Sequence, residues 1–187
     1  MLSVLRPDEL VLETERLWIR LYRDSDADRL FDTLRRDEVS QWLGDRPRAM
    51  QERSEAVSRI AAWRAISAAE PRHGIWASEV KDTGEVAGCV LLVPAPDPEG
   101  RYGGAIEVGW HLHPDAWGRG YAREGGAAVL AKGFADGLEV ILAFVRPDNE
   151  PSARVCAAIG MRKHRVSRDE WYSGEWLMYR AARSELR

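Results

Sequence analysis

The pattern of hydrophobic and polar positions predicts a strand and two helices in the first part of the chain. Residues 15–22 alternate around Leu17, Ile19 and Leu21, which is typical of a strand. Helix-capping residues at 24–26 precede apolar residues at helical spacing. A second helix is expected over 51–69. It should end there because Pro71 disfavours helical backbone just before it.

The middle and the end of the chain predict a hairpin, two strand–helix units and a second hairpin. The elements expected here are strands at 75–80 and 86–93, a loop at 94–104, a strand at 105–112, a segment at 118–135 that starts glycine-rich and becomes a helix, a strand at 140–145, a helix at 149–159 and a hairpin within 162–182. Two late strand–helix units favour a parallel strand pair. We therefore expect an α/β fold, with a mixed, mostly antiparallel sheet and helices on both faces.

Length and charge narrow the possible classes of protein. The 187 residues suit one domain over residues 1–187. The net charge of −3 disfavours a dedicated nucleic-acid binder. The longest apolar run, 140–145, is too short for a membrane span, and the acidic first fifteen residues do not resemble a secretory signal. These features predict a cytoplasmic protein with no membrane or nucleic-acid partner.

Cysteine and histidine positions give no indication of a metal site. Cys89 and Cys156 are far apart in the sequence and form no CxxC pair, so we expect two buried thiols. His111 and His113 have strand spacing that places them on one face, but no third ligand is apparent nearby. No metal is therefore expected.

The stretch with the clearest chemistry is the glycine-rich turn between the strand at 105–112 and the next helix. Helix N-termini attract anions, and Gly118 and Gly120 carry no Cβ that would keep a phosphate away. Arg119 and Arg123 add positive charge. A structural strand-to-helix turn explains the same residues. The spacing matches neither the P-loop nor the dinucleotide-binding fingerprint, so another phosphate carrier is expected.

These residues resemble the GNAT acyltransferases, in the branch that includes the ribosomal-protein alanine N-acetyltransferases. The family's pyrophosphate loop [QR]-x-x-G-x-[GA] matches positions 117–122, with Trp117 in place of Gln or Arg, as in the W-G-x-G-Y-A form of this branch. Residues 12–20, 107–110, and 148–152 with 159–161 resemble further signatures of the branch, in the expected order. The resemblance implies that the core of the domain covers about residues 12–182.

The resemblance implies that acetyl-CoA binds in a V-shaped opening between the fourth and fifth strands. The pantetheine arm would pair with the main chain of the fourth strand, and an N–H near Leu112 would hold the thioester oxygen. Ser152 would lie near the sulfur as the candidate acid, since Cys156 replaces a tyrosine common in the family. The residues implied to bind the co-substrate are Trp110, His111, Leu112, Trp117, Gly118, Arg119, Gly120, Tyr121, Ala122, Arg123, Asn149 and Ser152. Helix capping by Asn149 is an alternative role.

Glu107 is the candidate general base, acting directly or through water. By alternation it shares a face with Gly109 and His111, opposite Trp110 and Leu112. A structural ion pair with Arg101 or Arg146 is the alternative, and His111 competes for the role of base. The basic run 162–165 is interpreted as a solvated strand edge or as a contact to the 3′-phosphate of CoA.

Together, the residues and the resemblance predict an N-acetyltransferase that moves an acetyl group from acetyl-CoA to a primary amine, by direct attack in a ternary complex. The acceptor, a protein N-terminus or a small molecule, is expected to contact residues 41–43, Trp63, Trp171 and Tyr172. A catalytically weak acyl-CoA-binding sensor is the alternative function. The identity of the acceptor, the acyl-chain preference and the oligomeric state stay open, and the tryptophan content allows a homodimer.

Overall fold

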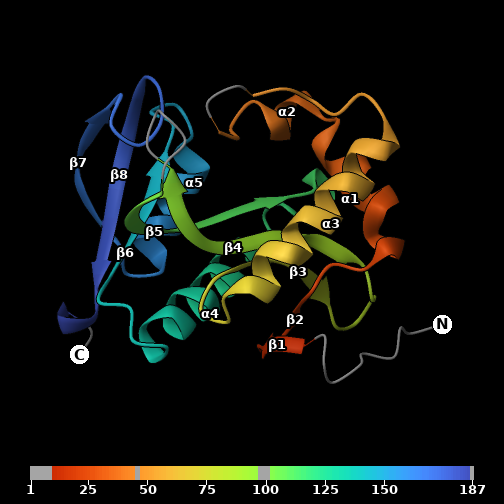
Figure 1. Cartoon of the computed structure of the whole chain (residues 1–187), viewed down its shortest axis with the longest axis horizontal. Helices are drawn as coiled ribbons and strands as arrows, with labels where there is room; N and C mark the ends of the chain where they lie inside the picture. Colours follow the sequence, from red (N-terminus) through yellow and green to blue (C-terminus); the bar gives the residue numbers. More distant parts are fainter. Residues whose placement is uncertain (1–9, 45–46, 97–101, 186–187) are drawn as a thin grey trace.

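The structure is a computed structural model that describes residues 10–44, 47–96 and 102–185. Within these ranges the chain forms one eight-stranded sheet with helices around it (Figure 1). The α/β class expected from the sequence is therefore confirmed. Among the described residues, no helix combines the length and the apolar character that a membrane crossing needs.

The strands follow the order β1-β2-β3-β4-β5-β6-β8-β7 across the sheet, and neighbours are antiparallel except β5 and β6, which are parallel. This is the mixed, mostly antiparallel sheet that the sequence predicts. The strand bounds are β1 Leu10–Glu13, β2 Leu17–Arg20, β3 Gly74–Val80, β4 Val86–Pro96, β5 Tyr102–Leu112, β6 Val140–Val145, β7 Arg162–Arg168 and β8 Glu175–Ala182.

Helices cover both faces of this sheet. Apolar residues of α1 and α3 form one core with β3 and β4, and residues of α4 and α5 form another with β4, β5 and β6. The helix bounds are α1 Ala27–Leu34, α2 Asp37–Ser40, α3 Arg53–Ala69, α4 Tyr121–Ala135 and α5 Glu150–Ala158, with short 3-10 turns η1 Asp24–Asp26, η2 Pro114–Ala116 and η3 Arg183–Glu185.

The structure differs from the sequence prediction at several element boundaries. Strand β1 and the short helix α2 were not predicted, whereas the segment 118–135 starts glycine-rich and becomes a helix as expected, with α4 beginning at Tyr121. The predicted loop 94–104 was too long, because β4 reaches Pro96 and β5 begins at Tyr102, while residues 97–101 lie outside the described ranges. The strand register shifts between Pro94 and Pro96, the kind of irregularity at which a sheet accommodates proline.

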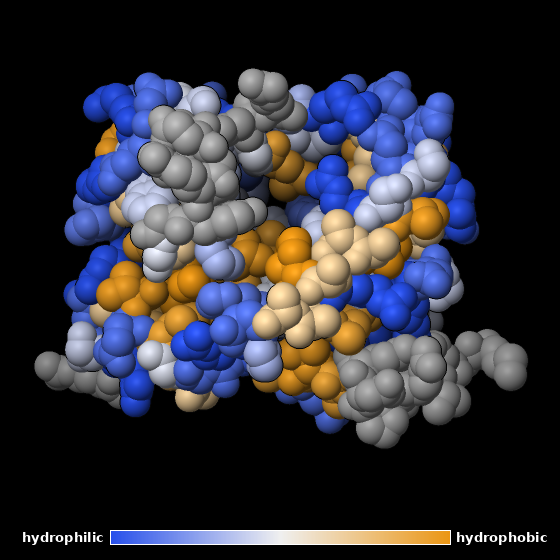
Figure 2. Space-filling model, in the orientation of Figure 1, coloured by the Kyte–Doolittle hydropathy of each residue, from blue (hydrophilic) through white to orange (hydrophobic). Residues whose placement is uncertain are grey.

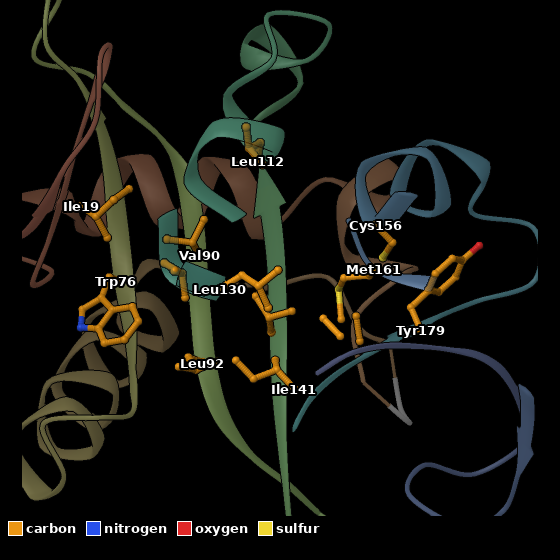
Figure 3. Packing of buried hydrophobic residues seen from close by; sticks show 14 of the residues in the cluster. Ile19, Trp76, Val90, Leu92, Leu112, Leu130, Ile141, Cys156, Met161 and Tyr179 are labelled. Atoms are coloured by element: carbon orange, nitrogen blue, oxygen red, sulfur yellow. The ribbon is translucent and has the colours of Figure 1, made fainter. Parts of the chain in front are cut away.

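Glycines in α4 bring this helix close to the sheet. A Cβ on Gly125 would lie 2.9 Å from a methyl of Val90, and one on Gly133 would lie 2.7 Å from the Cδ1 atom of Ile141. Figure 3 shows Val90, Leu92, Leu130 and Ile141 in this core. This close packing fixes the position of the N-terminal end of α4, which follows the glycine-rich turn.

Candidate active site

An opening separates β5 from β6 at the centre of the sheet. In the described chain the two strands pair at one register position, Glu107 opposite Leu142. Beyond it, β5 stays paired with β4 up to Leu112 while β6 continues along β8, and Figure 1 shows β6 pointing away from β5. This is the V-shaped opening expected between the fourth and fifth predicted strands. It exposes an edge of β5 to which an extended ligand can add main-chain hydrogen bonds.

The glycine-rich turn lies at the end of β5 and leads into α4. Gly118 and Gly120 have φ values of +71° and +81°, in the left-handed region that favours glycine. Gly120 is the N-cap of α4, so the N–H groups of the first helical turn have no partners within the helix. The turn therefore requires glycine for its own backbone as well as for the approach of an anion.

A charged cluster from the start of the chain holds this turn in place. The Arg16 guanidinium donates to the carbonyl of Arg119 at 2.8 Å and to the Glu124 carboxylate at 2.7 Å. The Thr14 hydroxyl and the Arg16 main-chain N–H donate to the other oxygen of Glu124, at 2.6 and 2.7 Å. Burial raises the pKa of Glu124, but the hydrogen bonds from Thr14 and Arg16 outweigh it and hold the pKa below its usual value.

The predicted co-substrate residues of the turn lie between the end of β5 and the start of α4. The Trp117 indole N–H donates to the Leu112 carbonyl at 3.0 Å, which ties the turn to the end of β5. The indole nevertheless stays 49% exposed. Arg119 and Arg123 are exposed on either side of the helix start. Their charges are available to an anion bound at the first turn of α4.

The start of α5 contains the other predicted co-substrate residues. The Asn149 side chain accepts a hydrogen bond from the Ser152 main-chain N–H at 3.2 Å, so Asn149 caps α5. Ser152 is partly buried, and no hydrogen bond involves its hydroxyl in the part of the chain that the structure describes. One turn later, Cys156 is fully buried, and burial raises the pKa of its thiol to about 12.

Glu107 lies at the apex of the opening, and a tyrosine contacts its carboxylate. Burial raises the pKa of Glu107 by more than the hydrogen bond that the Tyr172 hydroxyl donates to Oε2 lowers it, so that the pKa is about 7. The predicted ion pair with Arg146 is wrong, because the Arg146 guanidinium lies 3.9 Å from the centre of the Trp176 ring and donates to the Gly44 carbonyl. Arg101, the other predicted partner, lies outside the described residues.

His111 shares the face of Glu107, as the alternation predicts. Its ring lies 6.0 Å from the Trp63 ring of α3, whereas Trp110 packs on the other face, against α4. Burial and, to a smaller extent, the positive charge of Arg59 lower the pKa of His111 to about 4. The imidazole is therefore neutral at physiological pH. Its Nε2 atom is buried without a hydrogen-bond partner among the described residues.

Aromatic side chains stand on both sides of this face of β5. Trp63 contacts Tyr22 and His111 on the side of α3. Trp171 and Tyr172 pack against Phe144, with ring centres 6.1 and 5.4 Å apart, on the side of β6 and β8. Figure 2 shows a hollow near the middle of the molecule, where β5 crosses in Figure 1, with hydrophobic residues at its margin.

The remaining sequence predictions concern metals and the basic run. Among the residues that the structure describes, no group of three or more histidine, cysteine or acidic side chains is suited to a metal. The His113 ring contacts Asp32 at 2.8 Å and Asp115 at 2.9 Å. Residues 162–165 are exposed on β7, the last strand of the sheet, and Arg165 pairs with Glu170. The solvated-edge interpretation of this run is confirmed, and the 3′-phosphate contact stays a prediction.

A match to a protein family model shows to which family this fold belongs. The acetyltransferase (GNAT) domain matches residues 16–162 of this chain. The chain belongs to the GNAT acetyltransferase family. As a GNAT protein it is an acetyl-CoA-dependent acetyltransferase, which agrees with the opening at β5 and the glycine-rich turn.

Individual GNAT relatives support this placement. An uncharacterized N-acetyltransferase of Bacillus subtilis, YoaA, is 33% identical over 164 residues, covering 87% of this chain and 88% of YoaA. The ribosomal-protein-S5-alanine acetyltransferase of Vibrio fischeri superposes with a TM-score of 0.72 at 21% identity, covering 94% and 98% of the two chains. RimL, a ribosomal L7/L12 α-N-protein acetyltransferase solved with coenzyme A, gives a TM-score of 0.74 at 16% identity, covering 93% and 98%. The fold is thus shared with ribosomal-protein acetyltransferases, as the sequence motifs suggest.

Three residues of the GNAT site were not assigned their roles from the sequence. Arg16 lies inside the recognised motif at 12–20 and Glu124 lies two positions after the one at 117–122, but their mutual contact spans 108 positions. Tyr172 was predicted to touch the acceptor, not the candidate base. Its position just before Ser173-Gly174, in a hairpin turn, was the available signal, but which residue it meets depends on the sheet order.

Proposed function

We propose that this GNAT protein acetylates a primary amine by direct attack on acetyl-CoA, with Glu107 as the general base. The observation that carries this proposal is the carboxyl of Glu107 at the apex of the opening between β5 and β6, with a pKa raised to about 7. A base with a pKa near the working pH combines the ionised form with useful basicity. Its negative charge also favours a cationic amine before deprotonation.

The co-substrate is proposed to bind along β5 and at the start of α4. The pantetheine arm adds to the free edge at residues 110–112, and the pyrophosphate lies on the main chain of the 118–122 turn, between Arg119 and Arg123. An N–H near Leu112 polarises the thioester carbonyl. Trp117 positions the turn through its hydrogen bond to the Leu112 carbonyl.

The acceptor is proposed to enter between the two aromatic groups, one around Trp63 and the other around Tyr172. The buried Nε2 of His111 and the buried Nε1 of Trp171 have no hydrogen-bond partners among the described residues. Buried polar atoms are seldom left unpaired in folded proteins. Both atoms therefore support a polar acceptor that supplies the missing hydrogen bonds.

The reaction follows from this placement. Glu107 takes a proton from the ammonium, directly or through water, and the neutral nitrogen attacks the thioester carbon. The new C–N bond forms as the C–S bond breaks, and the nitrogen loses its second proton to give the amide. The Ser152 hydroxyl hydrogen-bonds to the departing thiolate, or protonates it and regains its own proton from the one that the nitrogen releases. Holding both substrates together gives the effective molarity of an intramolecular reaction. No acyl-enzyme is needed.

A screen of amines tests the proposal. The panel contains peptides with N-terminal alanine or serine, small alkylamines and amino-acid analogues, and thiol release from acetyl-CoA is measured. At least one class is expected to give turnover that Glu107→Gln reduces. Binding of acetyl-CoA without turnover on any class would instead support the sensor function.

A further inference from the structure

The carboxylate of Glu107 is held by a side chain from the far end of the sequence. Tyr172 lies 65 positions after Glu107, in the turn between β7 and β8. Strand β8 pairs with β6, and β6 meets β5 at Glu107. The sheet order β5-β6-β8-β7 thus brings the tip of this hairpin onto the apex of the opening.

Packing fixes the ring of Tyr172. Phe144 of β6 meets it edge-on, with ring centres 5.4 Å apart, and Trp176 of β8 lies 5.0 Å away. The turn itself is closed by Asp169, whose carboxylate accepts the Gly174 N–H at 2.6 Å. A ring held on two sides presents its hydroxyl to Glu107 without a large loss of side-chain freedom.

The contact uses one oxygen of the carboxylate. The Tyr172 hydroxyl donates to Oε2, and in the described part of the chain no hydrogen bond reaches Oε1. A carboxylate that accepts a hydrogen bond on one oxygen has its plane oriented and its other oxygen available to a second donor. An incoming ammonium or its bridging water is such a donor.

We propose that Tyr172 is a positioning residue that orients Glu107 toward the acceptor amine and stabilises its ionised form. This rests on the proposed role of Glu107 as the base. Tyr172 keeps its own proton throughout, and it acts on the base through the hydrogen bond to Oε2.

The first test needs no acceptor. The carboxyl carbons of glutamate are labelled with ¹³C, the Glu107 resonance is assigned with Glu107→Gln, and the free protein is titrated by NMR. Removing a hydrogen bond to a charged group in Tyr172→Phe is expected to move the Glu107 midpoint upward by about 1–2 pH units. The control Tyr179→Phe, the same chemical change on β8, is expected to leave the midpoint in place. An unmoved midpoint in Tyr172→Phe overturns the proposal, as does an equal shift in both variants.

The second test uses the acceptor found in the amine screen. In Tyr172→Phe the rise of turnover with pH is expected to move upward by the same amount, so that activity at neutral pH falls about 5- to 50-fold and recovers in alkali. The KM for acetyl-CoA is expected to stay unchanged. Loss that is equal at all pH values contradicts a role through Glu107. Full turnover of Glu107→Gln refutes the base itself, whereas an inactive Glu107→Gln with an unshifted Tyr172→Phe profile refutes only the role of Tyr172.

Discussion

Glu107 stands opposite Leu142 at the one register position where the described parts of β5 and β6 pair. The candidate base and the free edge of β5 therefore begin at the same point of the sheet. Burial at this apex raises the pKa of Glu107, and the divergence beyond it leaves main-chain groups open to the co-substrate. One topological feature, the single parallel pair, thus places two parts of the reaction next to each other.

Acetyl-CoA is expected to stabilise the protein through the turn at 118–122. Ligand at 100 times its Kd adds about 2.7 kcal/mol to the free energy of unfolding, a melting shift of roughly 5–10 °C for a domain of this size. Gly120→Val is expected to abolish the shift, because the new side chain enters the proposed phosphate site. The measurement is thermal unfolding with and without acetyl-CoA.

The structure also predicts a cost of Gly120→Val in the free protein and supplies a control. At φ +81° a side chain costs about 1–2 kcal/mol or more, so the free variant unfolds at a lower temperature. Gly137, just past the other end of α4, has φ +93° and open space around its Cβ position. Gly137→Val is expected to lose similar stability but to retain the acetyl-CoA shift. A retained shift in Gly120→Val would refute the assigned site.

The cluster around Glu124 predicts a pH-dependent contribution to stability. Its pKa is lowered in the folded state, so its stabilising effect is present above the unfolded pKa and is lost as pH falls through the folded value. Glu124→Gln is expected to cost about 1–3 kcal/mol at pH 7, and the difference from wild type should vanish in acid. The exposed Glu139, paired with Arg183 at 3.4 Å, gives the control, since Glu139→Gln should change little. Denaturant unfolding between pH 3 and pH 7 measures both.

Kinetic order distinguishes direct attack from a covalent route. Double-reciprocal plots are expected to intersect, because both substrates are bound before chemistry. Cys156 is a poor nucleophile, since it is fully buried and its pKa is raised to about 12. Cys156→Ala is therefore expected to keep its turnover within a few-fold. Parallel plots together with acetylated enzyme trapped without acceptor would contradict direct attack.

Local signals in the sequence were sufficient for much of the fold and part of the site. The strand at 140–145 has the predicted bounds, and alternation along β5 places Glu107 and His111 on the face opposite Trp110. The glycine-rich turn is local as well, because its glycines and the following helix are neighbours in the chain. These features depend on residues within one or two elements.

Contacts between distant segments escaped prediction. The approach of Tyr172 to Glu107 depends on the order β5-β6-β8-β7, and that of Arg16 to Glu124 depends on how α4 crosses the sheet near β2. The proposed ion pair of Arg146 failed for the same reason, because the stacking of its guanidinium on Trp176 is set by the pairing of β6 with β8. Charge and spacing alone do not rank such alternatives.

Glu107 is expected to destabilise the fold at alkaline pH. Its folded pKa of about 7 lies above the ordinary value, so the stability present in acid is lost as pH rises toward 7. Glu107→Gln stays neutral and should melt several degrees higher than wild type at pH 8, with the difference shrinking near pH 5. If wild type and Glu107→Gln melted at the same temperature at both pH values, burial would not raise the pKa of this carboxyl.

The pH dependence of turnover gives the decisive test of the base. Wild-type turnover per unit of enzyme is expected to rise through pH 7, as Glu107 ionises. His111, with a pKa of about 4, is already neutral there and produces no such rise. The measurement is the pH–rate profile of the wild type and of His111→Gln, which should show the same rise even if its maximal rate is lower.

Glu107→Gln should remove that rise and lower turnover at neutral pH by about 10²–10⁴, the usual contribution of a positioned base. An alkylamine with a pKa of about 10.4 is almost fully protonated at pH 7, so the variant depends on the small neutral fraction that solvent supplies. That fraction grows with pH, and the deficit of the variant should shrink accordingly. The acetyl-CoA melting shift should be unchanged, because the carboxyl is proposed to touch the acceptor rather than the co-substrate. Near-normal turnover of Glu107→Gln at neutral pH would leave deprotonation to water or His111 and reduce Glu107 to a structural partner of Tyr172.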